Sequence, residues 1–143
     1  MKKKLLALFV IGALSACGQA DSGAKAPKAE VAQKAELQVT HVDANKASEI
    51  IKARPDLVVI DVRTPGEFAS GHIDGAINID FKNANFATEI SKLDGTQDYL
   101  IHCRSGGRST ASLKHFKNKG FVHIIHMDGG MIAWNKAGLP TVK

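Results

Sequence analysis

From about residue 37 to residue 143, apolar segments of strand length alternate with segments of helix length. Five strands are predicted, over residues 37–42, 57–62, 76–79, 98–102 and 122–127. Four helices are predicted among them, over residues 44–53, 83–93, 109–119 and 130–137. This alternation predicts an α/β fold with a mainly parallel five-stranded sheet, right-handed crossovers and helices on both faces.

Local signals set the predicted helix boundaries. Asp43 is the expected N-cap of the first helix, and Gly120 is the expected stop of the third. The helical side chains predicted to face the core are Ala47, Ile50, Ile51, Phe86, Ile90, Leu93, Leu113, Phe116, Ile132 and Trp134. Because ligands of parallel α/β sheets bind beyond the carboxyl ends of the strands, we expect the functional site at that edge.

The first 16 residues resemble a bacterial lipoprotein signal peptide. Three lysines at residues 2–4 precede an apolar stretch over residues 5–14, which is too short to span a bilayer. Ala16 precedes Cys17, which we expect to be acylated and to anchor the exported protein to a membrane. Gly18 stands where Asp would resemble an inner-membrane retention signal, so the resemblance favours the periplasmic face of the outer membrane if the source is a diderm bacterium. The alternative is an ordinary secretory signal with an incidental cysteine.

The rest of the chain is predicted to be a tether followed by one domain. Residues 17–36, which include Cys17, show no apolar periodicity and are expected to form a flexible tether, and residues 37–143 form the domain. The whole chain has a net charge of +5, but without residues 1–16 there remain 16 basic and 14 acidic residues, a net charge of +2. With no basic stripe carrying interleaved aromatic residues, nucleic-acid binding is not expected.

A thiol, two glycines and two arginines share one short loop, Cys103-Arg104-Ser105-Gly106-Gly107-Arg108-Ser109. The loop joins a predicted strand to a predicted helix N-terminus, where backbone N–H groups favour negative charge. Gly106 and Gly107 allow successive N–H groups to converge, while Arg104 and Arg108 add positive charge. We therefore expect a lowered pKa for the Cys103 thiol and an anion held against its sulfur.

Cysteine usage limits the chemistry of this loop. If Cys17 is acylated, Cys103 is the sole thiol of the mature chain, and no disulfide can form within it. A lone cysteine can also be a small buried hydrophobe, but the glycine and arginine neighbours favour a chemical role. A thiol-redox protein is disfavoured because the chain has no Cys-x-x-Cys motif.

The loop resembles the Cys-x-x-Gly-x-Arg active-site loop of single-domain rhodaneses, which are thiosulfate sulfurtransferases. Two further stretches resemble the rhodanese signatures: IDVRTPGEF with GHIDGAINI over residues 60–79, and DGGMIAW with GLP over residues 128–140. The resemblance spans about residues 38–141 and implies a rhodanese-like fold. Phosphatases and arsenate reductases related to this fold carry Cys-x5-Arg, whereas four residues separate Cys103 from Arg108 here, the sulfurtransferase size.

The resemblance implies a double displacement through a persulfide on Cys103. The donor would be thiosulfate or a similar small anion, and the acceptor would be a thiol or cyanide. The residues implied to bind the donor are Arg104, Ser105, Gly106, Gly107 and Arg108. No cofactor and no metal are expected, and we expect a monomer. The alternative is a sulfur carrier or partner-binding module without useful turnover.

The remaining polar residues of the signatures favour structural roles. Asp61, Glu67 and His72 are expected to brace the sheet, and Arg63 could approach the loop without being catalytic. His102 is expected to point away from Cys103, because neighbours on a strand alternate faces. No metal-ligand constellation is evident among the histidines at positions 41, 102, 115, 123 and 126.

Overall fold

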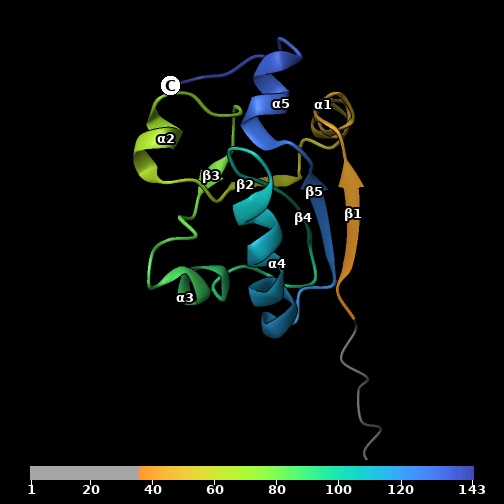
Figure 1. Cartoon of the computed structure of the whole chain (residues 1–143). Helices are drawn as coiled ribbons and strands as arrows, with labels where there is room; N and C mark the ends of the chain where they lie inside the picture. Colours follow the sequence, from red (N-terminus) through yellow and green to blue (C-terminus); the bar gives the residue numbers. More distant parts are fainter. Residues whose placement is uncertain (1–35) are drawn as a thin grey trace, which may run out of the picture. The chain divides into compact units, whose positions relative to one another are not determined.

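The computed structural model describes residues 36–143, which fold around a five-stranded sheet (Figure 1). The strands are β1 (Gln38–Val42), β2 (Val58–Asp61), β3 (Ile77–Asn78), β4 (Asp98–His102) and β5 (His123–Met127). They lie in the order β1-β5-β4-β2-β3, and every pairing between them is parallel. The predicted α/β fold with a parallel five-stranded sheet is therefore confirmed, and β4 is its central strand.

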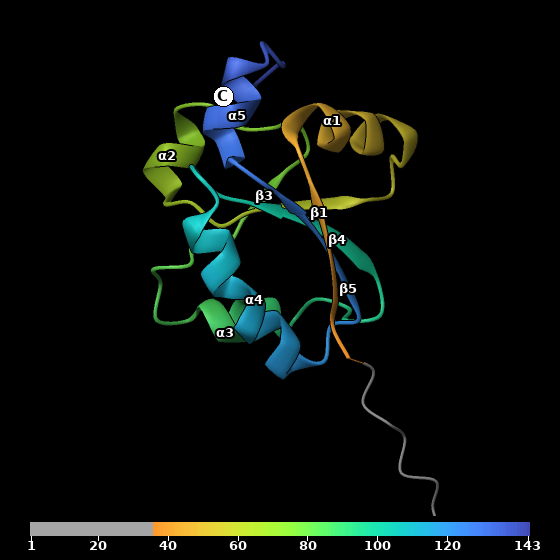
Figure 2. The same ribbon diagram turned by 45° about the vertical axis from the view of Figure 1, so that its right-hand side comes forward.

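Helices cover both faces of the sheet. They are α1 (Ala44–Ala53), α2 (Pro65–Ala69), α3 (Phe86–Ile90), α4 (Gly107–Lys119) and α5 (Gly130–Lys136). Helices α1 and α5 pack on one face of the sheet, and α3 and α4 pack on the other (Figure 2). Each of these two helix pairs contributes to its own apolar cluster. Within the described part of the chain, no helix combines the length and apolarity that a membrane crossing requires.

Strand side chains alternate between the two clusters. On β2 and β4, Val59 and Leu100 contribute to the cluster under α1 and α5, while Ile60 and Ile101 contribute to the cluster under α3 and α4. All four are buried, as expected for strands with both faces covered. The central strand therefore cannot shift by one residue without exchanging its side chains between the two cores.

Two helix N-termini are fixed by side chains. The Asp43 carboxylate accepts a hydrogen bond from the Lys46 N–H at 2.8 Å, which confirms Asp43 as the N-cap of α1. Thr64 and Glu67 form a capping box around α2, with Pro65 in the first helical turn. The short helix α2 was not predicted, because its five residues offer too little apolar periodicity. The capping-box residues were the one sequence signal that could have indicated it.

The structure corrects the predicted extent of α3. It covers Phe86–Ile90 rather than residues 83–93, and its later start follows from the Asn83 side chain, which accepts a hydrogen bond from the Asn85 N–H at 2.8 Å. Such local bonds compete with helix formation.

The prediction that Ile132 lies in the core is wrong, since its side chain is 50% exposed. On the short helix α5, the buried face is formed by Met131 and Trp134, three residues apart, and Ile132 points away from that face.

The predicted signal peptide over residues 1–16, Cys17 and the tether up to residue 35 lie outside the described residues.

Candidate active site

Cys103 directly follows the central strand β4 at the carboxyl edge of the sheet, between β2 and β5. Its side chain is 1% exposed. The loop turns back over the sulfur, so the Gly106 N–H donates a hydrogen bond to Cys103 Sγ at 3.1 Å. Gly106 adopts φ +100°, a left-handed conformation that favours glycine and that precedes the first turn of α4. The predicted position of the thiol at a helix N-terminus is thus confirmed.

The loop is held from its outer side by α5. The Met131 N–H donates to the Cys103 carbonyl, and the Ile132 N–H donates to the Arg104 carbonyl, both at 2.9 Å. These carbonyls satisfy N–H groups in the first turn of α5, which have no partner inside their own helix. Because the loop carbonyls point toward α5, the amide N–H groups that follow are left to face the sulfur.

Hydrogen bonds to the sulfur favour its ionised form. Burial raises the pKa of the Cys103 thiol, but hydrogen bonds from the Ser109 backbone and hydroxyl and from the Ser105 and Gly106 backbone N–H groups together hold that pKa below its ordinary value. The Ser109 hydroxyl lies 3.6 Å from Cys103 Sγ and only 2.9 Å from the Gly106 carbonyl oxygen, so the backbone amides carry most of the stabilisation. The thiolate is the nucleophilic form of cysteine.

The two arginines of the loop differ in their surroundings. Arg104 is exposed at the loop surface. Arg108 is half-buried, and its two terminal nitrogens each donate to a carboxylate oxygen of Glu67 at 2.7 Å. This hydrogen-bonded pair lowers the pKa of Glu67 to about 2. Glu67 therefore caps α2 and also contacts the loop, a role that sequence reasoning missed because 41 residues separate it from Arg108.

The bracing role predicted for Asp61 is confirmed, whereas His72 contacts α2. The buried Asp61 carboxylate accepts hydrogen bonds from the Arg63 side chain, the shortest at 2.6 Å, and Arg63 also donates to the Gly71 carbonyl. The Arg63 side chain is thus held by hydrogen bonds to β2 and to the segment after α2. His72 stacks on Phe68, with ring centroids 3.7 Å apart.

His102 points away from the sulfur, as predicted. Its Nε2 is buried 3.9 Å from Asp61 Oδ2, and burial lowers the pKa of its imidazole.

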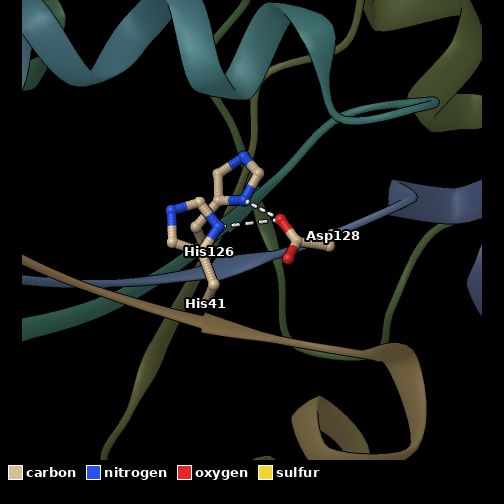
Figure 3. A group of neighbouring side chains, drawn as sticks. All are labelled: His41, His126 and Asp128. Carbon is tan, nitrogen blue, oxygen red and sulfur yellow. Dashed lines mark hydrogen bonds and ion pairs between the residues drawn. The ribbon is translucent and has the colours of Figure 1, made fainter.

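The histidines were predicted to form no metal-ligand constellation, and the structure brings two of them together with a carboxylate. β1 and β5 pair in a register that sets His41 beside His126, and both Nδ1 atoms reach the carboxylate of Asp128 (Figure 3). The register of a parallel pair cannot be obtained from the sequence of either strand alone. His126 Nε2 also lies 2.9 Å from the Ser109 hydroxyl, so the cluster touches a residue that contacts the sulfur.

The family to which the chain belongs follows from its match to a known domain. Residues 43–137 match the model of the rhodanese-like domain. The chain belongs to the rhodanese family. The matched residues include strands β2 to β5, the Cys103 loop and α5.

Rhodanese relatives cover most of the domain. A sulfurtransferase from Allochromatium vinosum is 31% identical over 104 residues, which are 73% of this chain and 95% of the relative. A chloroplastic thiosulfate sulfurtransferase 16 from Arabidopsis thaliana is 40% identical over 92 residues, 57% of this chain and 77% of the relative. The crystal structure of a rhodanese-related protein from Thermoplasma volcanium is 30% identical with a TM-score of 0.63, covering 72% of this chain and 97% of that one.

Proposed function

We propose that this rhodanese is a sulfurtransferase that carries a sulfane sulfur as a persulfide on Cys103, with thiosulfate or a similar anion as the donor. The observation that carries the proposal is the set of loop N–H groups directed at Cys103 Sγ, which holds the pKa of the thiol low. The names of the relatives from Allochromatium vinosum and Arabidopsis thaliana support the same reaction class.

The proposed reaction has two displacements. In the first, the Cys103 thiolate attacks the outer sulfur of thiosulfate; a new S–S bond forms as the S–S bond of thiosulfate breaks, and sulfite leaves with the electron pair. In the second, cyanide or a thiolate attacks the outer sulfur of the persulfide and restores the Cys103 thiolate. The loop N–H groups would stabilise the terminal sulfur of the persulfide as they stabilise the thiolate. If the Cys103 thiol reacts as the thiolate that the loop favours, no general base is needed.

The arginines would have unequal parts in donor binding. Arg108 interacts with Cys103 and is paired with the Glu67 carboxylate, so it would offer the donor a fixed guanidinium whose charge is already balanced. Arg104 is exposed and would meet the sulfite end of the donor. The amide groups of Ser105, Gly106 and Gly107 would complete the anion-binding loop.

The test is sulfur loading of the full chain. We expect thiosulfate to increase the intact mass by one sulfur atom and cyanide then to release thiocyanate over many turnovers. Cys103→Ser should abolish both results, whereas Cys17→Ser should retain them. Thiocyanate release by Cys103→Ser at the rate of the unmodified chain would contradict the proposal.

The alternative is a sulfur carrier that loads without useful turnover. The burial of Cys103 favours it, because a large acceptor would have to approach a side chain that is 1% exposed. A gain of one sulfur in mass without steady thiocyanate turnover would support the carrier. Failure to load from thiosulfate, polysulfide or a protein persulfide would contradict both functions.

We also propose that Cys17 is acylated after removal of residues 1–16, and that the domain faces the periplasm from the outer membrane if the source is a diderm bacterium. The support is the order of basic, apolar and cysteine-containing segments in the sequence. Labelling of cells with palmitate should mark the unmodified protein and spare Cys17→Ser. Equal labelling of the two would contradict the proposal.

A further inference from the structure

Three side chains converge on one point at the carboxyl edge of the sheet, on the β1–β5 side. His41 on β1 and His126 on β5 are register partners, and Asp128 follows the end of β5. His41 Nδ1 lies 2.9 Å from Asp128 Oδ1, and His126 Nδ1 lies 2.8 Å from the same oxygen (Figure 3). The three ligand atoms all lie within 4.8 Å of one another.

The chemistry of these atoms suits a transition-metal ion. Two imidazole nitrogens and one carboxylate oxygen form a mixed donor set that favours zinc, copper or nickel over calcium or magnesium, which prefer oxygen ligands. Ligand atoms about 2.0–2.2 Å from zinc in a tetrahedral site stand about 3.3 Å from one another. Metal binding requires the two Nδ1 atoms, which lie against Asp128 Oδ1, to carry no proton, and side-chain rotation would then set the three ligand atoms around the ion.

The cluster combines one fixed ligand with two accessible ones. The side chain of His126 is 1% exposed, and its Nε2 lies 2.9 Å from the buried Ser109 hydroxyl. This second contact fixes the ring and directs Nδ1 toward Asp128, as outer hydrogen bonds do for metal-binding histidines. The side chains of His41 and Asp128 are 53% and 56% exposed, so an ion and its water can reach the cluster.

We propose that His41, His126 and Asp128 bind a divalent transition-metal ion of the zinc class, with water completing the coordination. The site is separate from the sulfur chemistry proposed for Cys103 and does not depend on it. Ser109 lies between the two, because its hydroxyl is within reach of both His126 Nε2 and Cys103 Sγ.

The test uses the full chain with Cys17→Ser and Cys103→Ser in every protein, so that no thiol can bind the metal. Zn²⁺ is titrated by calorimetry into this parent and into the further variants His41→Asn and Asp128→Asn. We expect one saturable site in the parent and at least a tenfold weaker affinity in both variants. The two substituted side chains are more than half exposed, so folding should be unaffected.

His123→Asn is the matched control. His123 lies on the same strand, and its Nδ1 contacts Asp98 Oδ1 at 3.0 Å, so it forms a histidine–carboxylate pair away from the cluster. This variant should bind Zn²⁺ as the parent does. The proposal would be overturned by a parent without a saturable site, or by equal affinities in the parent, His41→Asn and Asp128→Asn.

Discussion

At the scale of single residues, Cys103 Sγ gains its acidity from backbone groups more than from charged side chains. The Gly106 N–H donates to the sulfur at 3.1 Å, and Arg108, which also interacts with the sulfur, is paired with the Glu67 carboxylate. Backbone amides are fixed by the fold and need no reorganisation when charge develops on the sulfur. Side-chain substitutions in the loop should therefore change the pKa of Cys103 only moderately.

Ser109→Ala should raise the pKa of the Cys103 thiol slightly. The substitution removes the hydroxyl at 3.6 Å but keeps the Ser109 N–H, which also lowers that pKa. The rate of iodoacetamide alkylation against pH gives the measurement, and its midpoint should move to higher pH. Ser105→Ala, which keeps the contributing backbone N–H, is the control and should leave the midpoint in place. A midpoint that moves to lower pH in Ser109→Ala would contradict this account.

Arg108→Ala should lower the rate of sulfur loading from thiosulfate at least tenfold. Without the guanidinium, the Glu67 carboxylate loses its partner close to the site and repels both the thiolate and the anionic donor. The double variant Glu67→Gln/Arg108→Ala should recover part of the rate. Arg54→Ala, which breaks an arginine–carboxylate pair with Asp98 at the start of β4, is the control and should load normally. Sulfur loading of Arg108→Ala at the rate of the control would show that Arg108 does not assist donor binding.

At the scale of elements, two helices connect to the loop from outside it. Glu67 of α2 pairs with Arg108 of α4, and the first turn of α5 donates to the carbonyls of Cys103 and Arg104. The loop is therefore positioned by elements that precede it and follow it in sequence. This explains why the loop motif alone does not determine its geometry.

The pair between Glu67 and Arg108 should make stability depend on acid pH. The pKa of Glu67 falls from 4.5 to about 2 in the folded protein, so the stabilisation is complete above pH 4.5 and is lost as the pH falls toward 2. After allowance for solvent screening, we expect a contribution of about 1–2 kcal/mol. Urea unfolding from pH 6 to pH 2 should show a smaller loss of stability in Glu67→Gln. Glu89→Gln, which removes an exposed pair with Lys92, is the control and should lose stability with falling pH as the unmodified protein does. The same pH dependence in Glu67→Gln would refute the expectation.

Gly130→Ala should disrupt the contact between α5 and the loop. Gly130 has φ +52°, and a Cβ there would meet the Cys103 carbonyl oxygen and lie 2.8 Å from the Arg104 carbonyl carbon. We expect a loss of about 2–4 kcal/mol in stability together with impaired sulfur loading, because backbone must move. Gly66→Ala is the control, since a Cβ at Gly66 meets nothing within 4 Å. Thermal unfolding and intact-mass measurements of sulfur loading give the comparison. Equal stability and equal loading of the two variants would contradict the prediction.

At the scale of the whole molecule, the sheet order brings distant segments to one edge. β4 lies between β2 and β5, so Cys103 after β4 has the Asp61–Arg63 pair on one side and the His126–Asp128 segment on the other. Both apolar clusters support this central strand through Leu100 on one face and Ile101 on the other. Damage to either core should therefore affect the site.

Phe116→Ala should destabilise the domain by about 3–5 kcal/mol, because Phe116 is fully buried and packs edge-on against Phe86 and Phe121. Ile132→Ala, at a half-exposed side chain, should change stability by less than about 0.5 kcal/mol. Denaturant unfolding of the two variants gives the comparison, and comparable losses would show that the core assignment is wrong.

The sequence by itself determined the local features of this protein. Apolar periodicity located a strand at Asp98–His102, Asp43 and Gly120 marked helix ends, and the loop after that strand placed the Cys103 thiol at a helix N-terminus. These features depend on residues within a few positions of one another, so their physical causes lie within one segment.

Only the tertiary structure decided the contacts between segments. It paired Glu67 with Arg108 across 41 residues, set His41 beside His126 with Asp128, and turned Ile132 outward. Each of these outcomes depends on strand order, strand register or the angle at which a short helix meets the sheet. Those quantities are fixed by packing of the whole domain, and no single stretch of the sequence contains them.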